Sequence, residues 1–106
     1  MKILLDHCVN RRVASFFGRH EVRTTLEFGW EALSNGELLR AANGHFDVLV
    51  TTDKKMEFQS SLAGLELAVA VLYTRANELV DLQQAIEALV PLIPTLPRGR
   101  FTRVPD

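Results

Sequence analysis

Residues 46–53 read FDVLVTTD, and this stretch decides the fold class of the chain. It predicts a strand that ends abruptly at Asp53. A short apolar run rich in β-branched residues is typical of a strand buried on both faces of a parallel sheet. The N-terminal stretch MKILLD repeats the pattern, because the apolar run over 3–5 also ends at an acid, Asp6. Two central strands are therefore expected, each followed by a carboxylate.

Helices and strands alternate along the rest of the chain. Periodicity predicts further strands over 20–25, 65–73 and, at an edge of the sheet, 100–104. It predicts helices over 10–18, 34–42 and 77–92, a brief turn or helix over 54–62, and a loop over 26–33. This alternation indicates an α/β fold, a three-layer sandwich with a mainly parallel central sheet, formed as one domain over 1–106. A strand order of 2-1-3-4-5 would place the switch point between the first and third strands.

The composition is that of an ordinary globular protein. The 106 residues are 47% hydrophobic and 24% charged. Twelve Lys and Arg residues against thirteen Asp and Glu give a net charge of -1, so nucleic acid would have to bind a local patch. Cys8 is the only cysteine, which excludes an intramolecular disulfide and a multi-cysteine zinc site. The apolar runs are too short for a signal-peptide core or a membrane span, so we expect a cytoplasmic protein with no membrane partner.

The two strand-terminal acids are the first candidate site. Adjacent strands are about 4.8 Å apart, so Asp6 and Asp53 would approach within roughly 4–6 Å at the switch point. Two such charges repel by roughly 3–4 kcal/mol at an effective dielectric constant of about 20, which favours a compensating cation such as Mg²⁺ or Mn²⁺. Glu37, in the first turn of the second helix, is a candidate third ligand. Three carboxylates around a divalent metal suit hydrolysis of a phosphodiester.

The same acids also have a purely structural interpretation. Asp6 and Asp53 each precede a helical segment and are suited to cap it. Glu37 stands three residues after Ser34, which is the spacing of a capping box. Both interpretations remain open at the level of the sequence.

Basic and aromatic residues near these acids suggest a binding surface. Arg12, Lys54 and Lys55 are candidates to contact substrate phosphates, and a solvated polar surface is the alternative. Phe28 and Trp30 are expected to fold back on the core rather than to stack on a nucleobase.

The order of the short motifs resembles a known family. MKILLD, HEV, SNGELL and DVLVTTDKKM, each followed by the expected kind of element, are similar to small PIN-like proteins, relatives of VapC-type toxin ribonucleases. The resemblance implies a Mg²⁺- or Mn²⁺-dependent ribonuclease with Asp6, Glu37 and Asp53 as catalytic metal ligands. It also implies an RNA substrate, a cognate antitoxin that blocks the toxin, and a homodimer.

A second interpretation keeps the fold without the catalysis. Lys55 stands where the family pattern usually has an acid, and a cation there opposes a second divalent ion. The alternative function is therefore a catalytically degenerate PIN-like protein that serves as a protein- or RNA-binding module.

Overall fold

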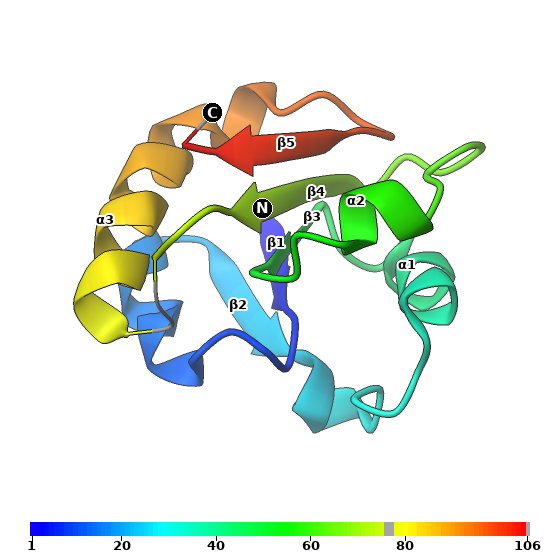
Figure 1. Cartoon of the computed structure of the whole chain (residues 1–106), viewed down its shortest axis with the longest axis horizontal. Helices are drawn as coiled ribbons and strands as arrows, with labels where there is room; N and C mark the ends of the chain where they lie inside the picture. Colours follow the sequence, from blue (N-terminus) through cyan, green and yellow to red (C-terminus); the bar gives the residue numbers. More distant parts are fainter. Residues whose placement is uncertain (76–77, 106) are drawn as a thin grey trace.

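A five-stranded sheet forms the centre of the computed structural model, which describes residues 1–75 and 78–105 (Figure 1). The strands are β1 (Lys2–Leu5), β2 (Glu21–Thr24), β3 (Val48–Thr51), β4 (Ala68–Leu72) and β5 (Phe101–Val104). Their order is β2-β1-β3-β4-β5, as predicted. Every pair of neighbouring strands is parallel, including the edge pair of β4 and β5, so the sheet is wholly parallel.

Helices cover both faces of the sheet and make three layers (Figure 1). The α-helices are α1 (Asn35–Ala42), α2 (Met56–Gln59) and α3 (Leu79–Leu89), and the 3-10 helices are η1 (Arg11–Phe17), η2 (Thr25–Phe28) and η3 (Val90–Thr95). One face packs against η1 and α3, and the other against α1 and α2. Within the described residues, no helix has both the length and the apolar character needed to cross a membrane.

The alternation of side chains along the central strands builds two cores. Ile3 and Leu5 of β1 point into the core under η1 and α3, whereas Leu4 points into the core under α1 and α2. All three side chains are fully buried. Because both faces of the central strands are covered, their sequences are continuously apolar rather than alternating. This explains why the two short runs identify the sheet.

Three segments differ in detail from the predictions. The predicted helix over 10–18 is the 3-10 helix η1, a form that is common in short connections. This helix ends at Gly18, which has a positive φ of 64°. The predicted loop over 26–33 contains part of η2, stabilised by a capping box between Thr24 and Glu27. The helix expected over 77–92 is α3 continued by η3; its predicted first residue, Asn77, lies outside the described residues.

The aromatic residues of the loop after β2 fold back as predicted. Trp30 packs against the core under α1 and α2, and its ring lies 6.3 Å from that of Phe46. Phe28 stacks on Trp30 with a centroid separation of 4.8 Å while remaining 45% exposed. Trp30 therefore covers part of this core while staying partly exposed, and Phe28 is the more exposed ring of the cluster.

Candidate functional site

Asp6 is buried at the carboxyl end of β1. Its backbone N–H donates to the carbonyl of Val50 in β3 at 2.9 Å, which fixes its position beside the neighbouring strand. The side chain is only 3% exposed. Its Oδ1 accepts the backbone N–H of His7 at 2.8 Å. A carboxylate this deeply buried is stabilised only by such hydrogen bonds or by a cation.

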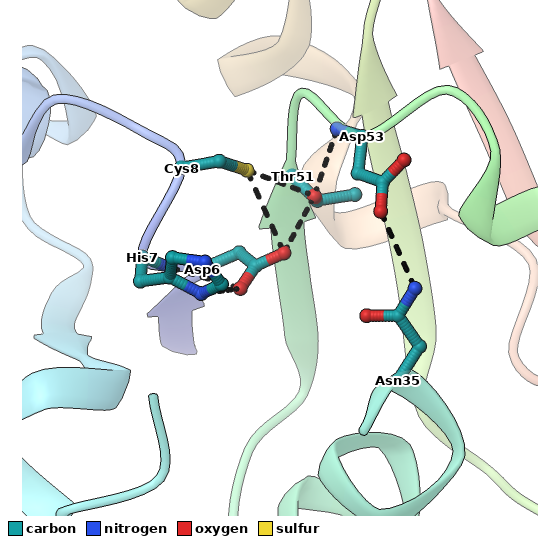
Figure 2. Close-up of polar contacts among 6 residues, drawn as sticks. All are labelled: Asp6, His7, Cys8, Asn35, Thr51 and Asp53. Carbon is teal, nitrogen blue, oxygen red and sulfur yellow. Dashed lines mark hydrogen bonds and ion pairs between the residues drawn. The ribbon is translucent and has the colours of Figure 1, made fainter. Parts of the chain in front are cut away.

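Thr51 connects Asp6 with the end of β3 (Figure 2). Its hydroxyl donates to Asp6 Oδ2 at 2.8 Å and accepts the backbone N–H of Asp53 at 3.0 Å. Thr51 is itself fully buried. One hydroxyl thus joins the two acidic positions across neighbouring strands, and the structure brings Asp6 and Asp53 to the same edge of the sheet as predicted.

Asp53 shapes the turn between β3 and α2. Its Oδ1 accepts the backbone N–H of Lys55 at 3.0 Å, a local bond typical of aspartate turns. Its Oδ2 accepts the side-chain amide of Asn35 at 3.3 Å. Asp53 therefore shapes a turn and faces a polar residue of α1. The prediction that the two acids cap helices is wrong, because the N-cap of η1 is Asn10 and that of α2 is Lys55, without a side-chain cap.

The first turn of α1 places Asn35, rather than Glu37, in contact with this acid (Figure 2). Glu37 accepts the backbone N–H of Ser34 at 3.0 Å, and its own N–H donates to the Ser34 hydroxyl at 3.3 Å. The bond from the Ser34 backbone lowers the pKa of Glu37 below its ordinary value. In this conformation Glu37 completes the predicted capping box. Over 1–75 and 78–105, no group of three or more His, Cys, Asp or Glu side chains is placed to share a metal ion.

His7 and Cys8, which directly follow Asp6, add to the polar cluster. His7 Nδ1 lies 3.1 Å from Asp6 Oδ1, with the imidazole 60% exposed. Cys8 Sγ lies 3.6 Å from Asp6 Oδ2 and 3.4 Å from Thr51 Oγ1. Neither Cys8 nor Thr51 was expected at the site, although the polar pair of threonines before Asp53 in an otherwise apolar strand was a usable signal.

The predicted phosphate-binding residues lie around this cluster without entering it. Lys54 is directed towards the end of β4, where its Nζ donates to the Thr74 carbonyl at 3.5 Å and lies 5.0 Å from the Tyr73 ring centroid. Lys55 and Arg12 are exposed. In the described part of the chain, no Lys or Arg nitrogen lies within 4.0 Å of the Asp6 carboxylate.

The donor set fits a hard cation. Asp6 and Asp53 supply carboxylate oxygens, Thr51 a hydroxyl and Asn35 an amide. Oxygen ligands of this kind are those that Mg²⁺ and Mn²⁺ prefer. The Asp6 carboxylate has no Lys or Arg partner among the described residues, and its polar neighbours are His7, Cys8 and Thr51.

A pocket of about 450 Å³ adjoins the buried acid. Its lining includes Asp6, Asn10, Arg11, Thr25 and Glu31. Among the described residues, the Thr25 hydroxyl is the buried side-chain polar atom that has no hydrogen-bond partner. This pocket therefore lies on the η1 and η2 side of Asp6, and Asp53 is not part of its lining.

Comparisons of the chain with protein-family models, curated proteins and solved structures give no match.

Proposed function

We propose that Asp6 and Asp53 bind one Mg²⁺ or Mn²⁺ ion and that the protein is a PIN-like ribonuclease that hydrolyses RNA phosphodiester bonds. The observation that supports this most is the buried Asp6 carboxylate, joined through Thr51 to the position of Asp53 and without a Lys or Arg partner in the described chain. A buried carboxylate of this kind gains most from a bound cation.

Each residue of the cluster then has a defined task. When bound, the cation lowers the pKa of a water molecule and neutralises charge on phosphoryl oxygens. Asp6 and Asp53 hold the ion, and Asn35 offers it an amide oxygen after rotation of its side chain. Thr51 keeps the two acids in register through its bonds of 2.8 and 3.0 Å. Arg12 of η1 and Lys55 in the turn after β3 are both exposed, and their charges attract the RNA backbone.

A second function, an RNA- or protein-binding module without catalysis, is favoured by a different observation. Glu37 is engaged in the capping box, and an uncharged residue, Asn35, stands next to Asp53. The site then has two carboxylates in place of the three implied by the family resemblance. A cognate antitoxin and a homodimer, which that resemblance also implies, remain predictions.

Cleavage of RNA by variants at the two ends of β3 distinguishes these functions. Asp53→Asn removes a proposed ligand, and Asp47→Asn is the matched control because Asp47 lies at the opposite end of the strand, where it accepts the Lys2 N–H at 2.7 Å. Loss of residues that merely support metal ligands costs about 10- to 100-fold, so Asp53→Asn should lower the Mn²⁺-dependent cleavage rate at least about 100-fold.

The Asp47→Asn variant should cleave RNA at the wild-type rate. Cleavage that persists in purified Asp53→Asn protein would contradict the proposed metal site. Wild-type protein that binds RNA but leaves it intact with Mg²⁺ and with Mn²⁺ would instead establish the binding module.

A further inference from the structure

A row of cations and aromatic rings begins beside Asp53 and crosses the ends of β3, β4 and β5. Lys54 Nζ lies 5.0 Å from the ring centroid of Tyr73. The guanidinium of Arg103 lies 5.6 Å from the Tyr73 ring and 5.7 Å from the Phe58 ring. We call Lys54, Tyr73, Arg103 and Phe58 the cation–aromatic row. Its members come from four separate segments, which the fold brings together around α2 and β5 (Figure 1).

The register of the sheet explains why these side chains meet. Arg103 of β5 pairs with Val71 of β4, and Tyr73 follows two residues later on the same face. Val71 and Tyr73 belong to the core under α1 and α2, so Arg103 and Tyr73 face α2. The row therefore follows from the parallel pairing of β4 with β5.

Phe58 is the exposed aromatic ring of the row. It is 71% exposed, whereas Met56 of the same helix is fully buried, so α2 presents one ring to solvent. The other exposed large hydrophobic residues lie on different elements: Met1, Leu26, Phe28, Leu79, Val80 and Leu92. An apolar protein interface needs a contiguous apolar patch. A single exposed ring among charged neighbours is better suited to stacking on a nucleobase.

Glu57 holds the guanidinium of Arg103 in place. Its two carboxylate oxygens accept from Arg103 Nε at 3.0 Å and Nη2 at 3.4 Å. The hydrogen bond to Glu57 raises the pKa of Arg103, so the group keeps its charge. With its edge engaged by a carboxylate, the guanidinium offers its flat face to aromatic rings rather than its N–H groups to phosphate.

We infer that the cation–aromatic row binds single-stranded RNA, with a base stacked on Phe58 and the backbone running past Lys54 towards Asp53. The inference extends the proposed function, because it states where the strand lies relative to the metal site. Alternating cations and rings are a general means of binding single strands without sequence preference, since every base has a stacking face.

Fluorescence anisotropy with a labelled single-stranded oligouridylate tests this directly. The measurement uses the full chain at low salt in EDTA, so neither metal binding nor cleavage contributes. Phe58→Ala and Phe58→Leu should each weaken binding roughly 5- to 150-fold, and Phe58→Trp should restore it, because base stacking contributes about 1–3 kcal/mol and needs an aromatic ring. Val80→Ala on α3, which also removes an exposed apolar side chain, should leave the affinity unchanged.

The outcomes separate this inference from the proposed function. Equal RNA affinity of wild-type and Phe58→Leu protein, or no RNA binding by the wild type, would contradict the inference that the cation–aromatic row binds RNA. This holds even if Mn²⁺-dependent cleavage were observed. Competition by duplex RNA as strong as that by the single strand would also overturn it, because paired bases are not free to stack. RNA binding that depends on the ring at position 58, without any RNA cleavage, would support RNA binding by the row and contradict the proposed ribonuclease activity.

Discussion

Thr51 is the residue that organises the acidic site. Its hydroxyl donates to one buried carboxylate and accepts the backbone N–H of the residue that carries the other. Removing a donor to a buried carboxylate leaves part of the desolvation cost of that group uncompensated. The contribution of Thr51 to stability should therefore depend on the presence of Asp6.

We predict that Thr51→Val lowers the free energy of unfolding by about 1–3 kcal/mol, since Asp6 Oδ2 loses its shortest hydrogen bond. Thr51→Ser keeps the hydroxyl and is the matched control, with a smaller loss from the missing methyl group. Urea unfolding measures both. In the double variant Asp6→Asn with Thr51→Val, the two losses should fail to add by at least about 0.5 kcal/mol. Additive losses would show that the bond does not stabilise the site.

The two acids could be predicted from the sequence, whereas their partners could not. Asp6 and Asp53 stand out because each directly ends a mainly apolar strand. The roles of Thr51 and Asn35 depend on the register of β1 against β3 and on the direction in which α1 begins. These features are set by tertiary packing rather than by local pattern. Its place in the first turn of the second helix predicts Glu37 as a ligand, but its carboxylate accepts the backbone N–H of Ser34, the N-cap of the same helix.

At the scale of elements, α1 depends on its capping box. Hydrogen bonds from Ser34 hold the pKa of Glu37 below its ordinary value of 4.5. A carboxylate with a lowered pKa in the folded state stabilises the fold above its unfolded-state pKa. This stabilisation is lost as the pH falls through the folded-state pKa.

Glu37→Gln tests this linkage, because Gln keeps an oxygen for the Ser34 N–H but does not titrate. We expect the wild type to be more stable than the variant at pH 7, and the difference to shrink when the pH is lowered to about 3, because the wild-type carboxylate takes up a proton as the pH falls through its folded-state pKa. Thermal unfolding at the two pH values measures the difference. A gap of the same size at both would contradict the assignment.

Local pattern located most elements but not the form of the connections. The apolar runs of β1, β3 and β4 and the capping box of α1 carry strong local signals. The connection after β1 is a 3-10 helix rather than an α-helix, and its apolar spacing suits both forms.

At the scale of the whole molecule, β5 completes the sheet where two segments distant in sequence approach each other closely. One segment precedes β4 and the other precedes β5. Gly99 has a φ of +68°, and its N–H donates to the Leu67 carbonyl at 3.0 Å. A Cβ at this position would lie 2.7 Å from the backbone oxygen of Leu65. Neither backbone segment yields easily, so Gly99 is needed for β5, and with it Arg103, to dock.

Gly99→Ala should therefore destabilise the protein more than Gly64→Ala. Gly64 has a similar φ of +79°, but nothing lies within 4 Å of its added Cβ, so only the backbone penalty of about 1–2 kcal/mol applies. Gly99→Ala incurs the same penalty and a steric clash in addition. Urea unfolding of the two variants gives the comparison, and equal losses would show that the β5 junction is not tightly packed.

Titration of the full chain with Mn²⁺ by isothermal calorimetry tests the central claim most directly. We predict saturable binding by wild-type and Asp47→Asn protein, no binding by Asp6→Asn or Asp53→Asn protein, and a higher melting temperature with Mn²⁺ in the first pair only. Absence of binding to folded wild-type protein, or binding of equal strength by Asp6→Asn, would contradict the proposed metal site.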